Sequence, residues 1–252
     1  MSEPMASGLT DGEWLALHRL ADEAEELRAG GRVVNVFDFF SGTGSSTAAF
    51  SHAGHTIRTF ELDPAFDATE TVSILDLDAE YLTRIYGRPD FVWASPPCTA
   101  FSVASIGHHW GGGHRQYLPK TDAARENQEL VAHTVRLIAG LQPRYGWLME
   151  NPRGVLRKLP AVRGLPRSTV WYCRYGDERA KPTDLWGGIE GWLPSRSCRN
   201  GASDHAAAPR GAKTGTQGRG GARDRSMVPY GLSYEVALRV FGASKGVSEV
   251  AA

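Results

Sequence analysis

The sequence predicts an α/β domain in which a mostly parallel sheet carries helices on both faces. Short apolar runs with strand character alternate with segments of helical period along most of the chain. This order is typical of parallel sheets connected by right-handed crossovers. A length of 252 residues and a hydrophobic content of 41% are enough for one large domain with a sizeable core.

The elements follow from local patterns. A first helix is expected at residues 10–28, where apolar residues recur at helical spacing before Gly30 and Gly31, and we expect it on the flank of the domain. The runs predicted as strands are residues 33–40, 56–61, 71–75, 91–94, 146–150 and 168–174. The later helices are predicted at residues 46–52, 121–139 and 233–241. Residues 103–116 are predicted as a loop because they hold four glycines and three histidines.

The composition of the chain excludes some classes of protein and indicates where the cell keeps it. With 28 basic and 28 acidic residues, the chain is no uniformly basic nucleic-acid binder, although a local basic patch remains possible. Such a patch occurs at residues 195–225, which hold seven Lys or Arg, two acids and few core-forming residues. We interpret it as a flexible basic loop, with a solvated linker as the alternative. Three cysteines indicate reducing conditions, and the absence of a signal peptide or long apolar run predicts a soluble cytoplasmic protein without membrane contact.

A glycine turn lies at residues 38–44 (Asp-Phe-Phe-Ser-Gly-Thr-Gly), between a predicted strand and a helix. Its glycines permit close approach of a ligand to the backbone. Glu61, at the end of the next strand, can accept from both hydroxyls of a ribose. Asp76 follows the third predicted strand. Because the third glycine of the dinucleotide pattern is missing, S-adenosylmethionine fits better than NAD, although two glycines alone also occur in ordinary turns.

Cys98 follows Pro96 and Pro97 directly after a buried strand. Prolines end a strand, and ligands bind at the carboxyl edge of open α/β sheets. A lone cysteine is usually an inert core residue. At this position, however, a thiolate could add to C6 of a pyrimidine ring and so make C5 reactive toward the methyl group of a sulfonium.

Covalent addition to cytosine also needs acid assistance at N3 of the ring. Glu150 ends the adjacent predicted strand, and its carboxyl group could donate to N3 and accept from the exocyclic amine. Taken alone, Glu150 reads as a residue that caps the turn before Pro152. Paired with Cys98, it is interpreted as catalytic.

The glycine turn, Glu61, Asp76, the Cys98 segment and Glu150 together resemble the motifs of the DNA cytosine-5 methyltransferase family. They occur in the family's order and cover residues 33 to about 155. The resemblance implies a Rossmann-like S-adenosylmethionine-dependent methyltransferase fold, with Cys98 as nucleophile and Glu150 as the partner of N3. It implies that the loop after Ser102 closes over a cytosine flipped out of DNA. The residues that would line the S-adenosylmethionine site are Phe40, Gly42, Gly44, Glu61, Leu62, Asp76 and Pro97.

The second half departs from the family pattern. The family shows Tyr-Gly followed by Gln-x-Arg-x-Arg, where this chain has residues 175–181 with the basic pair Arg179 and Lys181 but no Gln. The resemblance implies a catalytic role for Arg179. Residues 225–233 stand roughly where the family has a terminal Gly-Asn cofactor segment, and residues 182–186 resemble a variant of compact phage-type members.

The predicted organisation is one domain with a small insertion. Residues 1–30 form the flanking helix, residues 31–186 the catalytic and cofactor-binding domain, residues 187–228 a short basic target-recognition insertion, and residues 229–252 a C-terminal helix that returns to the core. DNA is the expected partner, held by phosphate contacts that read little sequence. The resemblance also implies a place in restriction–modification.

Two alternatives remain open, and a third is disfavoured. Amino-group DNA methyltransferases share the pattern up to Pro97 but carry an aromatic residue where Cys98 stands. A DNA-binding protein on a degenerate methyltransferase scaffold would explain the altered second half. A zinc site formed by Cys173, Cys198 and His205 has spacings that match no ordinary ligand pattern, so no metal is expected.

Overall fold

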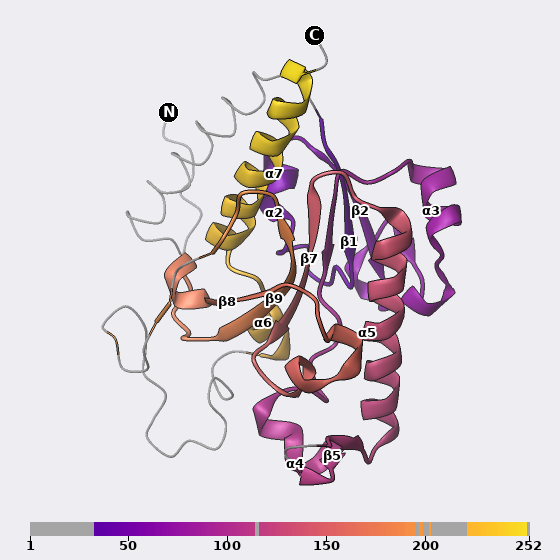
Figure 1. Ribbon diagram of the computed structural model, residues 1–252, viewed down its shortest axis with the longest axis vertical. Coiled ribbons are helices and arrows are strands. Elements are labelled where there is room, and N and C mark those ends of the chain that lie inside the picture. The colour runs from indigo at the N-terminus through magenta and orange to yellow at the C-terminus, as the bar shows by residue number, and fades with distance from the viewer. Residues whose placement is uncertain (1–32, 114–115, 195–196, 199–201, 203–220, 251–252) are drawn as a thin grey trace, which may run out of the picture.

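The computed structural model describes residues 33–113, 116–194, 197–198, 202 and 221–250. Its main feature is a seven-stranded sheet in the order β3-β2-β1-β4-β7-β9-β8, with helices on both faces (Figure 1). A separate two-stranded sheet pairs β5 (Trp110–Gly111) with β6 (Leu118–Pro119). The predicted fold class is confirmed.

Five strands run parallel and define the functional edge of the sheet. They are β1 (Asn35–Phe39), β2 (Thr56–Glu61), β3 (Glu70–Thr71), β4 (Phe91–Ala94) and β7 (Gly146–Pro152). Phe39 pairs with both Phe60 and Ala94, and Ala94 pairs with Met149. The segments that follow β1, β2, β4 and β7 therefore meet at one edge, as ligand sites do in open α/β sheets.

The far edge of the sheet is antiparallel. Strand β9 (Pro182–Ile189) pairs with β7 on one side and with β8 (Arg167–Trp171) on the other. The predicted strand at 168–174 is shorter than expected, because Tyr172–Tyr175 form the 3-10 helix η7. No strand was predicted at 182–189, where a proline and a Gly-Gly pair interrupt the pattern, but a proline is tolerated as the first residue of a strand.

Each face of the sheet has its own hydrophobic core. Helices α3 (Ala79–Tyr86) and α5 (Asp122–Leu141) cover one face, and α2 (Ala48–His52) and α7 (Tyr230–Val250) cover the other (Figure 1). The alternation of side chains along β4 separates the two cores, with Val92 and Ala94 in the first and Phe91 and Trp93 in the second. Burial on both faces explains why this strand is apolar without interruption.

Several local predictions were wrong. The expected strand at 71–75 ends at Thr71, because the Ser73 hydroxyl accepts from Leu75 N at 3.3 Å and caps the 3-10 helix η2 (Ile74–Asp76). Helix α3 was not predicted. The expected loop at 103–116 contains the 3-10 helix η3 (Val103–Ser105), helix α4 (Ile106–His109) and strand β5.

Of the other predicted elements, one helix is confirmed, and two segments lie largely among residues that the structure does not describe. Helix α5 begins after Thr121, whose hydroxyl accepts from Ala124 N as expected for an N-cap. The predicted helix at 10–28 and most of the insertion at 187–228 lie outside the described residues. Within the described ranges, no helix combines the length and apolar character that crossing a bilayer requires.

Candidate active site

The glycine turn after β1 is built from residues with positive φ. Phe40, Gly42 and Gly44 have φ values of 59°, 48° and 70°. Phe40 N donates to Phe60 O at 2.9 Å, which holds the turn against the end of β2. A Cβ added at Gly42 or Gly44 would meet no atom within 4 Å. These glycines are thus required for their backbone conformation, and the space beside them is open to a ligand.

Glu61 joins this turn to the end of β2. Its Oε2 accepts from Gly42 N at 2.9 Å, while Oε1 accepts from Leu62 N at 2.8 Å and Asp63 N at 3.2 Å. A carboxylate has about four acceptor positions. These three bonds therefore leave Oε2 able to accept a ribose hydroxyl without releasing the turn.

The predicted cofactor residues gather at this edge. Phe40, Gly42, Gly44, Glu61 and Leu62 surround the turn, and the Leu62 side chain is 67% exposed. Asp76 is exposed in η2, after the neighbouring strand β3, and Pro97 is exposed after β4. The backbone at Gly42 and Gly44 is open to a ligand, and the Glu61 carboxylate can accept a ribose hydroxyl. Both features fit S-adenosylmethionine.

Asp38 lies beneath the turn and is fully buried. Its Oδ2 accepts from the Ser46 hydroxyl at 2.7 Å and the Thr47 hydroxyl at 2.8 Å. Burial and, to a smaller extent, the charge of Glu61 raise the pKa of Asp38 to about 7, against these two hydrogen bonds, which lower it. The sequence motif contained Asp38, but no role was predicted for it.

This raised pKa makes stability depend on pH. Between about pH 4 and pH 7 the folded protein keeps a proton on Asp38 that the unfolded chain releases, so stability falls as pH rises, by up to about 4 kcal/mol. Asp38→Asn should remove this slope and leave other pH effects. Urea unfolding of both proteins between pH 4.5 and pH 8, without cofactor, measures the difference. Parallel curves for the two proteins would contradict the raised pKa.

The turn that carries Cys98 is held from several sides. Cys98 O accepts from Phe101 N and Ser102 N, both at 3.0 Å, which closes a tight turn after the two prolines. Asn151 Nδ2, at the end of β7, donates to Pro96 O at 2.9 Å in a buried hydrogen bond. This bond fixes the cysteine turn against β7, the strand that contains Glu150. Cys98 is partly exposed, whereas Cys173 and Cys198 are buried.

The electrostatic surroundings of Cys98 link it to the glutamate. Burial and then the charge of Glu150 raise the pKa of Cys98, while Lys181 and Arg225 lower it, and the net direction is upward. The predicted nucleophile is therefore a protonated thiol at neutral pH in the free protein. A thiolate must form before attack, and the two basic side chains favour it.

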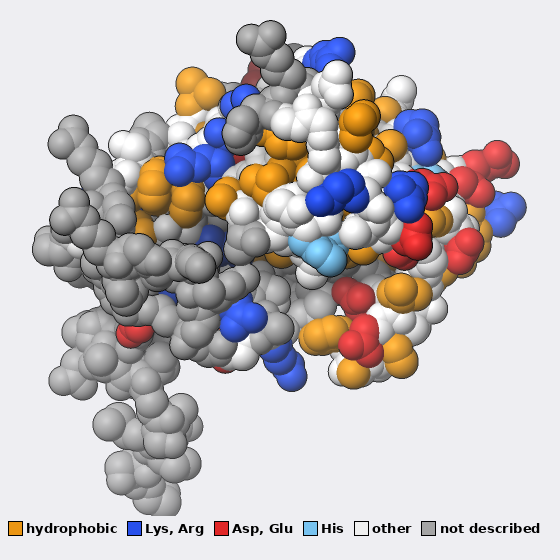
Figure 2. Space-filling view, turned by 90° about the horizontal axis from the view of Figure 1, so that it is seen from below, with side chains coloured by type: hydrophobic (Ala, Val, Ile, Leu, Met, Phe, Trp, Pro, Cys, Tyr) orange, Lys and Arg blue, Asp and Glu red, His pale blue; other side chains and the backbone are white. Residues whose placement is uncertain are grey.

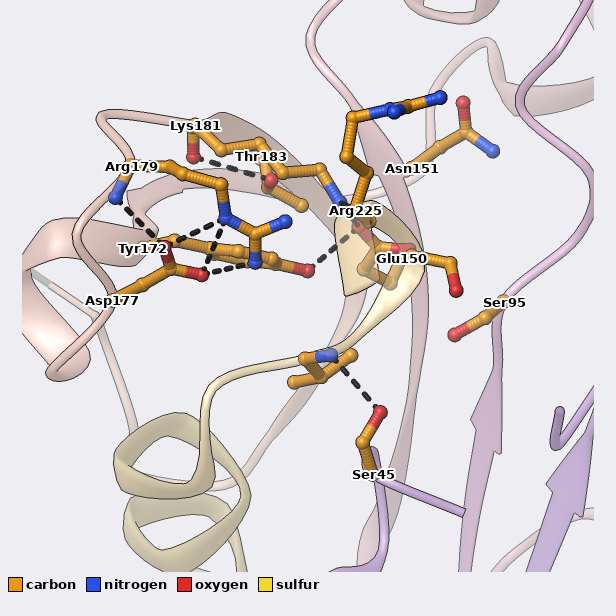
Figure 3. A network of polar contacts seen from close by, with 12 residues as sticks. Ser45, Ser95, Glu150, Asn151, Tyr172, Asp177, Arg179, Lys181, Thr183 and Arg225 are labelled. Carbon is orange, nitrogen blue, oxygen red and sulfur yellow. Dashed lines mark hydrogen bonds and ion pairs between the residues drawn. The ribbon is translucent and has the colours of Figure 1, made fainter. Parts of the chain in front are cut away.

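Glu150 is buried and held by a tyrosine (Figure 3). The hydroxyl of Tyr172, at the start of η7, donates to Glu150 Oε1 at 2.8 Å. Lys181 Nζ lies 3.9 Å from the same oxygen and 4.6 Å from the centre of the Tyr172 ring. Sequence reasoning missed Tyr172, because nothing in the pattern distinguishes it from Tyr175, which is also buried.

Arg179, predicted to be catalytic, lies away from Glu150. Its guanidinium forms a bidentate ion pair with Asp177, and its Nη1 donates to Asp224 O at 2.8 Å (Figure 3). Lys181 Nζ donates to Arg225 O at 3.1 Å. The structure thus brings Lys181, and not Arg179, to Glu150, and the catalytic role of Arg179 stays a prediction.

The basic pair instead anchors the segment that returns from the insertion. This return segment, residues 221–228, contains the short helix α6 (Ala222–Ser226). Besides the contacts of its carbonyls with Arg179 and Lys181, Val228 N donates to the Ser45 hydroxyl at 3.0 Å, and the Arg223 guanidinium lies 5.7 Å from the centre of the Phe66 ring. Phe66 closes the turn after Glu61. The return segment therefore contacts the end of β2, the glycine turn and the segment between η7 and β9.

The face around this edge carries mixed charge. Figure 2 views it from the end of the molecule where α4 and β5 lie in Figure 1, and it shows Lys and Arg side chains spread across the face with acidic side chains grouped on one side. This agrees with the neutral net charge of the chain. Among the described residues, no group of three His, Cys, Asp or Glu side chains could hold a metal ion, and His205 lies outside them.

Comparison with known proteins identifies the family. The model of the C-5 cytosine-specific DNA methylase family matches residues 34–160, which include the glycine turn, Glu61, Cys98 and Glu150. A Frog virus 3 protein named "Probable DNA (cytosine-5)-methyltransferase" is 33% identical over 175 residues, which are 66% of this chain and 78% of the viral protein.

Two solved structures align with this chain at 12% identity. The Entamoeba histolytica methyltransferase EhMeth aligns with a TM-score of 0.48 over 70% of this chain and 58% of its own, and S. pombe Dnmt2 with 0.44 over 66% and 52%. This chain thus spans little more than half of either solved chain, and the assignment rests on the family model and the viral relative. The chain belongs to the C-5 cytosine-specific DNA methylase family, whose members are S-adenosylmethionine-dependent DNA cytosine-5 methyltransferases, as its motifs predicted.

Proposed function

We propose that this chain methylates C5 of cytosine in DNA through a transient bond between Cys98 Sγ and C6 of a base flipped out of the helix. One observation carries the proposal. Cys98 follows β4, and Glu150 lies near the end of β7, the adjacent parallel strand. Both residues are thus at the same edge, where Asn151 ties the two segments together and Glu150 is close enough to influence the thiol electrostatically. A nucleophile and an acid beside one open edge suit addition to a pyrimidine.

The chain's residues perform the addition. Cys98 releases its proton to solvent, and the thiolate adds to C6 while the carboxyl group of Glu150 transfers a proton to N3, so that the electron pair released by the ring reaches C5. S-adenosylmethionine supplies the methyl group that C5 takes. The C5 hydrogen then leaves as a proton to solvent, the bond from Sγ to C6 breaks, and N3 returns its proton to Glu150.

The remaining predicted residues bind the cofactor. Glu61 would accept a ribose hydroxyl on Oε2, and the backbone at Gly42 and Gly44 would approach the ligand closely. Leu62, Asp76 and Pro97 are the exposed residues on neighbouring strand ends that would flank it.

DNA would be held by the basic insertion. Residues 195–225 can contact phosphates, which position a protein without reading sequence, so a short or relaxed target is expected. Flipping the cytosine would cost a few kcal/mol, and least in distorted or single-stranded DNA. A cytoplasmic location and a place in restriction–modification stay predictions.

A 5-fluorocytosine oligonucleotide tests the covalent mechanism. With S-adenosylmethionine present, the fluorine at C5 cannot leave as a proton would, so the bond to Cys98 persists, and we expect a denaturant-stable complex that maps to the peptide containing Cys98. The matched oligonucleotide with cytosine should give 5-methylcytosine and no stable complex.

The alternatives predict different outcomes. Methylated exocyclic amines without a trapped complex would show an amino-group methyltransferase. A failure to bind S-adenosylmethionine in calorimetry would show a catalytically inactive scaffold. The family assignment and the presence of Cys98 argue against both.

A further inference from the structure

We propose that Tyr172 is a positioning residue that fixes which oxygen of Glu150 carries the proton delivered to cytosine. This inference rests on the proposed function, because it assigns a role within the same reaction. In this arrangement, Tyr172 donates a hydrogen bond to Oε1 of Glu150 and Lys181 forms an ion pair with the same oxygen. Oε2 is then the oxygen that exchanges the proton with N3.

The geometry places both partners on one oxygen. The Tyr172 hydroxyl lies 2.8 Å from Oε1, and Lys181 Nζ lies 3.9 Å from the same atom. Figure 3 shows Tyr172 and Lys181 approaching Glu150 from the side of η7 and β9, whereas Ser95 and Asn151 lie on its other side. The partners of Oε1 therefore come from the antiparallel edge of the sheet, and the segment after β4 that carries Cys98 lies on the other side.

The phenol is a fixed donor. Burial, followed by the charge of Glu150 and the hydrogen bond to it, raises the pKa of Tyr172 well above its ordinary value, so the hydroxyl keeps its proton at any working pH. Tyr172 is fully buried, and the Lys181 ammonium lies over its ring, which limits its movement.

A proton on Oε1 would be opposed twice. It would compete with the proton that the Tyr172 hydroxyl donates, and it would face the positive charge of Lys181. A proton on Oε2 meets neither obstacle. The carboxyl group thus presents its acidic hydrogen on one side, and the hydrogen bond from Tyr172 prevents the group from rotating the proton away from the base.

Tyr172→Phe tests this role because it removes one hydroxyl and keeps the packed ring. We expect kcat to fall about tenfold to hundredfold, the value of one hydrogen bond to a charged group, with little change in KM for DNA or S-adenosylmethionine. The matched control is Tyr145→Phe, which removes the hydroxyl of another buried tyrosine just before the opposite end of β7. It should leave kcat near the wild-type value, because Tyr145 precedes β7 at the end opposite to Glu150.

A double-mutant cycle separates positioning from stability. In a Glu150→Gln background, Tyr172→Phe should change the remaining rate less than twofold, because the residue acts through the carboxyl group, whereas a purely structural effect would multiply the two losses. Equal kcat for Tyr172→Phe and wild type, or multiplied losses in the cycle, would overturn the inference. If wild type makes no 5-methylcytosine while it binds S-adenosylmethionine, it is the proposed function that fails.

Discussion

Replacing Cys98 with serine is expected to lower cytosine methylation by roughly four orders of magnitude or more, because a hydroxyl at this position is a far weaker nucleophile than a thiolate. The substitution leaves the glycine turn and Glu61 unchanged, so S-adenosylmethionine should still bind. Bisulfite sequencing of DNA from cells that express each protein measures the methylation, and calorimetry measures the cofactor.

Two controls sharpen this result. Cys173→Ala removes a buried thiol outside the proposed machinery and should keep methylation near the wild-type level. The wild-type rate should rise with pH through the neutral range, because the raised pKa of Cys98 leaves the thiol largely protonated there. Methylation that survives Cys98→Ser, or a rate that falls across that range, would refute the assigned nucleophile.

The largest effect on stability is expected from Asp184→Ala. Asp184, in β9, is fully buried and accepts from Arg157 Nε at 2.9 Å and Nη2 at 2.5 Å, and from the Thr169 hydroxyl at 2.7 Å. Its loss leaves the Arg157 guanidinium, whose side chain is 23% exposed, without this partner. We expect a loss of about 3 kcal/mol in the free energy of unfolding, measured by urea titration.

The exposed ion pair between Asp122 and Arg125 provides the control. These side chains are 98% and 56% exposed, so Asp122→Ala should cause little change through this pair. Replacing the buried pair by Arg157→Met together with Asp184→Leu should cost less than Asp184→Ala alone, because no buried charge is left unpaired. If the double replacement is the less stable of the two, the buried charge is not the cause.

The parallel half of the sheet, and the glycine turn and glutamate at its edge, could be predicted from the sequence. Strands such as residues 91–94 are apolar throughout because both faces are buried, and this pattern is visible without neighbours. The glycine turn could also be predicted, because a backbone with positive φ favours glycine, as at Gly42 and Gly44. Glu61 could be predicted because it is a carboxylate at the end of a strand.

What could not be predicted depends on partners distant in sequence. Strand β9 exists because β7 and β8 pair with it on both sides, although its own composition contains breakers. Lys181 lies beside Glu150, whereas the Arg179 guanidinium pairs with Asp177. A sequence motif gives only the order of residues along the chain. It does not show which of two basic side chains, Arg179 or Lys181, lies beside Glu150, because that depends on ion pairs such as the one between Arg179 and Asp177.

The way in which the return segment is attached makes it tolerant of changes in its side chains. Three of its attachments use main-chain atoms: Asp224 O and Arg225 O accept from Arg179 and Lys181, and Val228 N donates to Ser45. Main-chain donors and acceptors are the same in every amino acid except proline, which lacks the N–H. Substitutions in this stretch can therefore accumulate while its attachment beside the catalytic edge is kept.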